Sequence, residues 1–313
     1  MKTLRFHEYG EPADVLRLEE VAVPSPRAGQ IRVRVRACGL NPADWYLCRG
    51  LFAGDLPRGV GLDVSGTVAA VGEGVRDVRI GQCVLGVPDF RGVPSAGASD
   101  EAVLAVWTPV PQGLDLVEAA ALPMAVETAC RCLDILAVAA GRTLFVYGAG
   151  TMIGFAAVQM ALMRGTRVIA AAGDTFAGRL RALGAEVTSY GDGMVERVLE
   201  IGAGAPDLIF DAGPISGVLP DLVRIAGGDA RRVLTVSNHG PVAEGLRVRN
   251  SFEGELRYNV LGDFAKLAAE ERFAVPVART FPLEEWREAL DLSLSGHAHG
   301  KLLLLPAGAT ARD

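Results

Sequence analysis

The sequence predicts an α/β protein with two domains: a doubly wound parallel sheet and a second, mostly antiparallel β domain. Two observations predict this. Short apolar strands alternate with helical patterns and glycine-rich connections between residues 142 and 236, whereas strands with strict apolar–polar alternation and glycine turns fill the first 120 residues. With 313 residues, half of them hydrophobic, the chain is long enough for two cores.

The β–α alternation is clearest where it begins. Leu144–Tyr147 is an apolar run that suits a strand buried on both faces of a parallel sheet. Gly148, Gly150 and Gly154 follow, and then come an apolar helix and a second strand over 167–172. In such a unit the glycines let the backbone turn close to a pyrophosphate, and the helix N-terminus presents N–H groups to that anion. A bound dinucleotide is therefore the first hypothesis.

The glycine spacing is G-x-G-x-x-x-G, one residue longer than the common dinucleotide pattern, so a tight β–α turn without a ligand is the alternative. A mononucleotide P-loop is not expected, because no Gly-Lys-Ser/Thr follows the turn. The continuing alternation favours the dinucleotide and predicts a parallel sheet with helices on both faces. The expected elements are helices over 176–183, 194–201 and 219–225 and strands over 186–188, 207–211 and 232–236.

The first 120 residues follow another pattern. From Gln30 to Ala37 apolar residues alternate with three arginines, which predicts a half-buried antiparallel strand with a solvated basic face. Asn41 and Pro42 are typical of a helix start, as N-cap and first helical residue, and the helix is expected to end near Gly50. The remaining expected elements are strands over 63–71, 78–85, 246–249, 275–280 and 301–305 and helices over 261–270 and 283–294.

Composition argues against several classes of function. The net charge is −6 and no basic cluster stands out, so we expect no nucleic-acid partner. The uncharged stretch 148–163 is too short and too rich in glycine to span a membrane, and the first ten residues lack the apolar core of a secretion signal. The five cysteines show no disulfide framework. We therefore expect a cytoplasmic protein with reduced thiols and no membrane partner.

Five segments carry a family resemblance. They are GQIRVRVRACGLNPADW, GLDVSGTVAAVGEGV, GLDLVEAAALPMAVETA, the glycine turn and RTFPLEEWREALDLSLSGHAHGKLLL. Together they resemble the medium-chain dehydrogenases/reductases, and specifically the zinc-independent quinone oxidoreductase branch. The resemblance covers nearly the whole chain. It implies a GroES-like, mostly antiparallel β catalytic domain over 1–120 and 264–313 and a Rossmann domain over 121–263.

The zinc ligands of related enzymes are not matched. Those enzymes bind catalytic zinc through a Cys, a His-Glu pair and a further Cys or Asp. Here Asn41 stands at the first position, Gly61-Leu62-Asp63 stands in place of Gly-His-Glu, and the four-cysteine structural lobe is missing. The pair His297 and His299 lies in a Gly-bounded turn near the C-terminus. Zinc needs about four N or S ligands, so no zinc site is expected.

Without zinc, the resemblance implies hydride transfer from a nicotinamide cofactor to an electron-poor double bond, with a proton from a side chain or water. It places Asn41 and Tyr46 on the substrate side of the nicotinamide, where the Tyr46 phenol can hydrogen-bond the substrate and pass on a proton. A surface tyrosine and a simple N-cap are the alternatives for these two residues. Asp44 is interpreted as a first-turn charge that complements the helix dipole. Thr128 matches the family threonine near the nicotinamide carboxamide, although a helix threonine bonded to its own backbone would look the same.

The end of the second strand of the unit bears on the choice of cofactor. NAD sites place an acidic residue there, but this chain has Ala172 and Gly173, which do not repel a 2′-phosphate. Gly173 and Tyr190 resemble NADPH-binding members, whereas Arg179 comes about two residues late for their basic residue and Asp174 adds an unfavourable charge. We predict NADPH, with NADH as the alternative. Further cofactor-binding positions implied by the resemblance are Met152, Ile153, Ser237 and Lys301.

Three functions remain open. The first is an NADPH-dependent reductase of quinones or α,β-unsaturated carbonyls. The second is an enoyl reductase for a dedicated, polyketide-type intermediate, whose pocket Leu51–Gly54 and the loop Asp89–Ser99 would shape. The third is a dinucleotide-binding sensor or structural protein without turnover. Thr151, where the family has glycine, leaves this last possibility open, because its hydroxyl either reaches a phosphate oxygen or weakens cofactor binding. The resemblance also implies a homodimer paired around Val242–Arg257.

Overall fold

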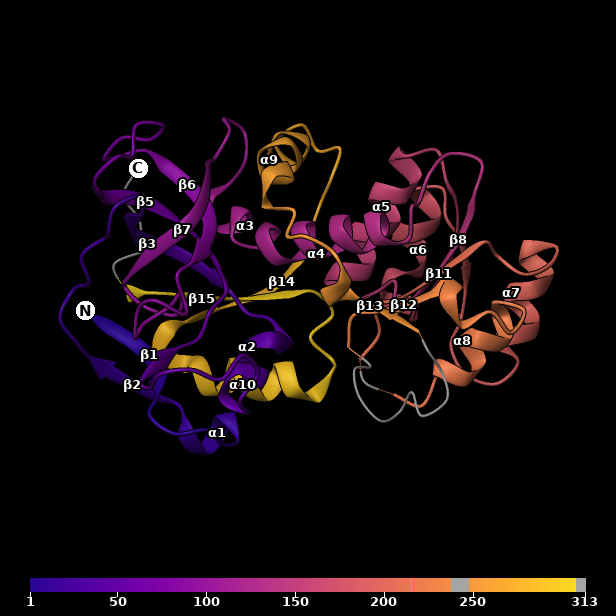
Figure 1. Cartoon of the computed structure of the whole chain (residues 1–313), viewed down its shortest axis with the longest axis horizontal. Helices are drawn as coiled ribbons and strands as arrows, with labels where there is room; N and C mark the ends of the chain where they lie inside the picture. The colour runs from indigo at the N-terminus through magenta and orange to yellow at the C-terminus, as the bar shows by residue number, and fades with distance from the viewer. Residues whose placement is uncertain (215, 238–247, 308–313) are drawn as a thin grey trace. The chain divides into compact units, whose positions relative to one another are not determined.

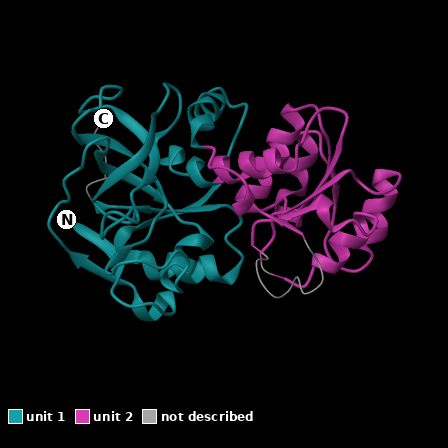
Figure 2. Cartoon of the chain, in the orientation of Figure 1, with its two compact units in different colours: residues 1–124, 258–313 teal, residues 125–257 magenta. Residues whose placement is uncertain are grey.

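The computed structural model describes residues 1–214, 216–237 and 248–307. The chain forms two compact units, shown in different colours in Figure 2. Unit 1 comprises residues 1–124 and 258–313, and unit 2 comprises residues 125–257. The expected domain boundaries, after residue 120 and before residue 264, lie a few residues from these positions.

Unit 1 is built on two sheets, and all of their strands except β4 are labelled in Figure 1. The larger has the order β14-β15-β3-β5-β6-β7, and an extra pairing of β3 with β7 closes four of its strands on themselves. All its pairings are antiparallel except β14–β15, which confirms the predicted GroES-like β domain. The smaller sheet has the order β2-β1-β4. The strands are β1 (Lys2–Phe6), β2 (Arg17–Glu20), β3 (Ile31–Gly39), β4 (Arg58–Gly59), β5 (Asp63–Val71), β6 (Cys83–Pro88), β7 (Glu101–Pro109), β14 (Val277–Pro282) and β15 (Lys301–Leu305).

The helices of unit 1 pack on these sheets through a core of large apolar side chains. Phe6, Trp45 and Phe281 are all fully buried in it. The Trp45 indole donates a hydrogen bond to the Ser293 hydroxyl at 2.8 Å, so a helix from each end of the sequence is joined within this unit. The helices are α1 (Pro12–Val15), α2 (Pro42–Cys48), α3 (Leu116–Ala119), α9 (Leu261–Ala269) and α10 (Trp286–Ser295), with short 3₁₀ turns at Tyr258–Val260 and Leu283–Glu285.

Unit 2 is a six-stranded parallel sheet with the order β10-β9-β8-β11-β12-β13. The strands are β8 (Thr143–Tyr147), β9 (Arg167–Ala171), β10 (Glu186–Thr188), β11 (Leu208–Asp211), β12 (Val233–Thr235) and β13 (Arg249–Asn250). The central residues of β8, β9, β11 and β12 are fully buried, as expected for a parallel sheet covered on both faces. The strand order reverses between β8 and β11, which confirms the predicted doubly wound fold.

The helices of unit 2 alternate with its strands along the chain. They are α4 (Leu122–Ile135), which begins just before the unit boundary, α5 (Met152–Met163), α6 (Asp174–Ala182), α7 (Met194–Gly202) and α8 (Leu219–Ile225), with 3₁₀ turns at Ala230–Arg232 and Ser251–Glu253. Of the helices that the structure describes, none combines the length and apolar character needed to cross a membrane.

Two expected strands differ from the structure. The strand predicted over 78–85 begins only at Cys83, because a turn precedes β6: the Gln82 N–H donates to the Arg79 carbonyl at 3.1 Å, and Gly81 adopts a φ of +88°. The sequence predicts a strand over 246–249, whereas β13 covers Arg249–Asn250. Residues 238–247, and with them part of the expected dimer segment, lie outside the described residues.

Candidate functional site

A buried polar network lies at the start of α2 in unit 1. The Lys301 ammonium nitrogen lies 2.6 Å from Asp63 Oδ2 and 2.5 Å from Asn41 Oδ1. The Asn41 amide donates to Asp63 Oδ2 at 2.9 Å, and the Met124 backbone N–H donates to Asp63 Oδ1 at 2.7 Å. Lys301 is 3% exposed and Asp63 is 0% exposed, so both charges are removed from water. The network supplies each charge with several partners, as buried ions require.

Three strand ends bring this network together. Asp63 is the first residue of β5 and Lys301 the first of β15, and both strands pair with β3 at Gly39, two residues before Asn41. A Cβ atom on Gly39 would lie 2.8 Å from Lys301 Cε and 2.4 Å from the Ala120 carbonyl oxygen. Glycine is therefore needed at this position for the lysine to reach the carboxylate.

Asp44 is a second buried carboxylate beside the network. It lies in the first turn of α2, as expected, but it does more than complement the helix dipole. Its Oδ2 accepts the Asn41 N–H at 2.7 Å and its Oδ1 accepts the Gly61 N–H at 2.6 Å, so it ties the helix to the segment before β5. Complete burial, opposed by the two backbone hydrogen bonds and supported by the nearby Asp63 carboxylate, raises the pKa of Asp44 to about 7.

The two predicted catalytic residues differ in whether their polar groups already form hydrogen bonds within the protein. Asn41 is the N-cap residue of α2, and its side-chain amide is engaged by Asp63 and Lys301. Tyr46 lies half-buried on α2, and its hydroxyl makes no hydrogen bond to any residue that the structure describes. The Arg49 guanidinium lies 5.7 Å from the centroid of its ring. Of the two, Tyr46 has the polar group that remains free to bond a ligand.

In unit 2 the glycine turn follows β8. Gly148 adopts a φ of +76°, and a Cβ atom there would lie 2.4 Å from the Gly213 backbone nitrogen, just after β11. A Cβ atom on Gly154 would lie 2.2 Å from the Gly148 carbonyl oxygen. Both glycines are therefore required for the turn to pass between the ends of β8 and β11, where the strand order reverses. Ligands of doubly wound sheets bind at such a point.

Helix α5 begins in this turn with Thr151 as its N-cap. The Thr151 hydroxyl accepts the Gly154 N–H at 3.0 Å and lies 2.9 Å from the Gly148 carbonyl oxygen. The hydroxyl is therefore used within the turn, which neither of the expectations for this threonine included. The N–H groups of Met152 and Ile153 have no acceptor among the described residues. Together with the helix dipole, they form a place for an anion.

Two further predicted residues lie at the same edge of the sheet. The Tyr190 hydroxyl interacts with the Gly150 backbone, and burial raises its pKa to about 12. Its ring meets that of Tyr147 edge-on, with 5.1 Å between centroids. The Ser237 hydroxyl donates to the Gly213 carbonyl. The turn, Tyr190 and Ser237 thus gather at the carboxyl ends of the parallel strands.

Three more predicted residues belong to helices α4 and α6. Gly173 is the N-cap of α6, and Arg179 is exposed in the last turn of that helix. The Thr128 hydroxyl, on α4, donates to the Glu127 carboxylate at 3.2 Å. Arg197, which the sequence did not single out, holds the segment that carries Tyr190: its guanidinium donates to the Asp192 carbonyl at 2.7 Å and to the carbonyls of 189 and 190 at 3.0 and 3.3 Å.

Comparison with known proteins identifies the family. Residues 27–105 match the model of the alcohol dehydrogenase GroES-like domain, and residues 183–304 match that of a zinc-binding dehydrogenase. The quinone oxidoreductase of Sus scrofa is 31% identical over 331 aligned residues, which cover 97% of this chain and 98% of the relative. The chain belongs to the medium-chain dehydrogenases/reductases, in their quinone oxidoreductase-like branch.

Two further relatives agree with this family. The 2-methylene-furan-3-one reductase of Solanum lycopersicum is 32% identical over 201 residues, or 60% of this chain and 51% of the relative. The solved quinone oxidoreductase of Coxiella burnetii superposes with a TM-score of 0.80 at 27% identity and covers 97% of this chain and 99% of that one. The protein is thus an oxidoreductase of the reductase type that uses a nicotinamide dinucleotide and a small-molecule substrate.

Proposed function

We propose that this protein is an NADPH-dependent reductase that delivers hydride to a quinone or an α,β-unsaturated carbonyl compound without zinc. The observation that carries the proposal is the buried network at the start of α2. Asn41 and Asp63, at positions where zinc-dependent relatives have ligands, give their oxygens to the Lys301 ammonium group, while the Tyr46 hydroxyl on the same helix stays free.

The residues at these positions do not fit a zinc ion. Zinc in proteins is held by thiolates, imidazoles and carboxylates in a near-tetrahedral set. The one carboxylate at the compared ligand positions, Asp63, already faces a cation at 2.6 Å. Within residues 1–214, 216–237 and 248–307, no group of three or more His, Cys, Asp and Glu side chains could hold a metal ion.

The residues of unit 2 do fit a dinucleotide. The Met152 and Ile153 N–H groups would face a pyrophosphate, which Gly148 allows to come close to the backbone. Strand β9 ends without an acidic residue, since Ala172 and Gly173 follow it, so a 2′-phosphate meets no carboxylate at the strand end. This favours NADPH, with NADH as the alternative. When bound, the nicotinamide supplies the hydride.

Tyr46 is the residue that we assign to the proton. Hydride addition to a carbonyl-conjugated double bond leaves negative charge on the oxygen, and a phenol can stabilise that oxyanion by hydrogen bonding and then protonate the product. The Asn41–Asp44–Gly61 hydrogen bonds and the Lys301–Asp63 pair hold the start of α2 in place. They act as positioning groups for the tyrosine.

The test is oxidation of NADPH and of NADH by the purified protein, with a small quinone and a simple enone offered separately. Rapid turnover of either acceptor supports the reductase, and the ratio of the rates with the two cofactors tests the preference for NADPH. Tight NADPH binding without turnover of any enone or quinone would contradict the reductase and favour the dinucleotide-binding sensor.

The second candidate is the enoyl reductase for a dedicated biosynthetic intermediate. The observation that favours it is a pocket that joins Phe52–Asp55 with Arg91, because the sequence suggested that these two segments would shape a substrate pocket. A transfer of hydride to an enone attached to a pantetheine arm, and none to small enones, would select this candidate.

We also propose a homodimer that pairs through unit 2. Strand β13 lies at the edge of the parallel sheet, with one side paired to β12. Beside it, Phe252 is 56% exposed and Leu256 is 65% exposed. An edge strand that has no second neighbour among the described residues and is flanked by exposed apolar side chains is typical of a pairing surface. A monomer in light scattering at micromolar concentration would contradict the dimer.

A further inference from the structure

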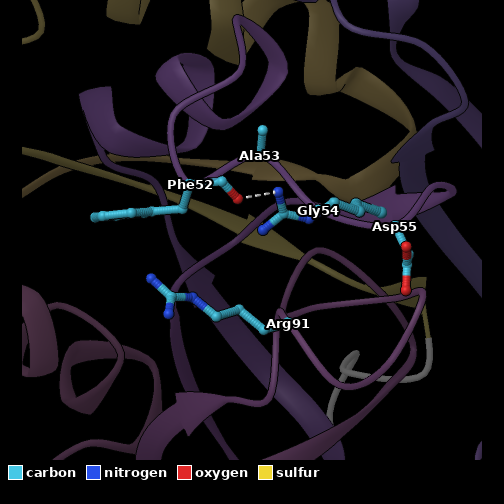
Figure 3. Close-up of a pocket in the computed structure, with 6 residues that line it drawn as sticks. Phe52, Ala53, Gly54, Asp55 and Arg91 are labelled. Atoms are coloured by element: carbon cyan, nitrogen blue, oxygen red, sulfur yellow. Dashed lines mark hydrogen bonds between the residues drawn. The ribbon is translucent and has the colours of Figure 1, made fainter.

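A pocket of about 340 Å³ lies in unit 1 and is drawn in Figure 3. Residues Phe52–Asp55, which follow α2, line it together with Arg58 of β4 and Arg91 of the loop after β6. The chain reaches this pocket directly from Tyr46, because the Tyr46 carbonyl accepts the N–H of Leu51, the residue before Phe52, at 2.8 Å. The pocket and the proposed proton donor therefore belong to one continuous segment of one unit.

Two arginines, Arg58 and Arg91, and one carboxylate, Asp55, line the pocket, so its lining has a net positive charge. The Arg91 guanidinium lies 4.7 Å from the Phe52 ring centroid, and Arg58, only 4% exposed, donates to the Phe52 carbonyl at 2.6 Å. Neither arginine forms an ion pair within the part of the chain that the structure describes. Figure 3 shows the Asp55 side chain pointing away from the Arg91 guanidinium. Arg91 is exposed, so its guanidinium is accessible to an anion that enters the pocket from solvent.

The walls of the pocket are held in place before any ligand binds. The Tyr9 hydroxyl donates to the Gly54 carbonyl at 2.8 Å and accepts the Gly54 N–H at 2.7 Å. On the other side, the Asp89 carboxylate accepts the Gly92 N–H at 2.9 Å. Phe52 adopts a φ of +54°, a left-handed conformation that is unfavourable for a residue with a side chain. Such strained backbone is concentrated at ligand sites, where a fixed geometry lowers the entropic cost of binding.

We propose that this pocket binds an oxyanion, a carboxylate or a phosphate, and so selects acidic enones or quinones as substrates. The selection of substrates rests on the proposed reductase function, whereas the binding of an oxyanion does not. A guanidinium matches the two oxygens of a carboxylate or phosphate, and Arg91 is oriented for this by stacking on Phe52.

The binding test uses four ligands without redox chemistry: 2-naphthoate, 2-naphthyl phosphate, 2-naphthalenesulfonate and neutral 2-naphthol, measured by titration calorimetry. We expect the anions to bind more tightly than the naphthol, and the ratio of carboxylate to phosphate affinity to tell which oxyanion the pocket prefers. Arg91→Gln should lower the affinity for the favoured anion about 10- to 100-fold, as expected for loss of a charge-assisted hydrogen bond, and leave the affinity for the naphthol unchanged. Arg34→Gln removes an equal charge from an exposed position of β3 and serves as the control.

The kinetic test compares 1,2-naphthoquinone with its 4-sulfonate. We expect Arg91→Gln to raise KM for the sulfonate about 10-fold or more at an unchanged kcat, with no change for the neutral quinone. Arg58→Lys, which keeps the charge inside the unit, should lose part of the same discrimination. Equal affinity for naphthol and the anions, or equal effects of Arg34→Gln and Arg91→Gln, would overturn the proposal that this pocket binds oxyanions. Anion binding that Arg91→Gln abolishes, with no turnover of either quinone, would support the pocket and contradict the reductase.

Discussion

The Lys301 ammonium group lies 2.6 Å from the Asp63 carboxylate across 238 positions of sequence, and both side chains are buried. Each residue begins a strand that pairs with β3. The pair is bonded to Asn41, the N-cap of the helix that carries Tyr46. A single ion pair thus fixes the start of the helix that holds the proposed proton donor. Because removing one partner leaves an uncompensated buried charge, the pair can be tested by mutation.

Lys301→Met is expected to lower the free energy of unfolding by about 3–5 kcal/mol, because the Asp63 carboxylate stays buried without its cation. Adding Asp63→Asn to this variant should recover part of the loss by removing the charge. Urea unfolding at pH 7 measures both changes. Lys2→Met is the matched control, since Lys2 forms an exposed pair with Glu284. A loss of stability in Lys2→Met as large as in Lys301→Met would contradict the assigned role of burial.

Asp44 should make stability depend on pH. Its pKa is about 7 in the folded protein, whereas an unfolded aspartate titrates near pH 4. Between these values the folded state keeps a proton that the unfolded chain has lost. The stabilisation that Asp44 contributes is therefore present below about pH 4, falls as the pH rises to about 7, and stays low above that, with a total change on the order of 4 kcal/mol.

The measurement is the difference in unfolding free energy between the parent protein and Asp44→Asn from pH 4.5 to 8. Taking this difference cancels the contributions of the other carboxylates to the pH dependence of stability. Several of them, such as Glu19 beside Arg5, have lowered pKa values and therefore make stability rise with pH. We expect the parent to lose stability relative to Asp44→Asn as the pH rises. Two parallel curves would show that Asp44 is ionised throughout.

Sequence reasoning succeeded where the signal is local. The glycine turn, the N-cap Asn41 and the strand over 63–71 are each set by a few adjacent residues, and the structure has each of them in place. The Thr151 cap was missed although its signal is local too: a threonine three residues before Gly154 is a normal helix cap, but the family pattern drew attention to phosphate instead.

Sequence reasoning does not find contacts that require distant strands to meet. The family pattern implies a cofactor role for Lys301, which stays a prediction, but nothing near Lys301 in the chain indicates Asp63 as its ion-pair partner. That pairing depends on the registers of β5 and β15 against β3, which bring both side chains to Gly39. The sequence indicates the two loops that form the pocket, but it does not indicate that Arg58 lines it. The place of Arg58 depends on its hydrogen bond to the Phe52 carbonyl.

Gly148→Ala should damage the dinucleotide turn. A Cβ atom there would lie 2.4 Å from the Gly213 nitrogen, and the φ of +76° is unfavourable for alanine. We expect a loss of more than about 1 kcal/mol of stability together with weaker NADPH binding, measured by urea unfolding and by quenching of protein fluorescence. Gly178→Ala, in the open on α6, should instead stabilise the protein by about 0.5–1 kcal/mol. Equal effects of the two substitutions would contradict this view of the turn.

Thr151→Ala separates a structural role from a cofactor role. The hydroxyl caps α5, so its removal should cost about 1 kcal/mol of stability, while Thr151→Ser keeps the cap and the stability. Because the hydroxyl is used within the turn, NADPH affinity should change little in either variant. A large loss of affinity at unchanged stability would instead assign this hydroxyl to a phosphate oxygen.

Tyr46→Phe tests the proposed chemistry most directly. The hydroxyl makes no hydrogen bond to any described residue, so its loss should leave the urea unfolding midpoint unchanged. If the phenol stabilises the oxyanion and supplies the proton, kcat should fall about 100-fold or more, the usual size of a general-acid contribution, while NADPH binding stays the same. Stopped-flow oxidation of NADPH with a quinone or enone across the pH range measures this. Turnover equal to that of the parent at every pH would mean that water delivers the proton, and Tyr46 would then be a packing residue of α2.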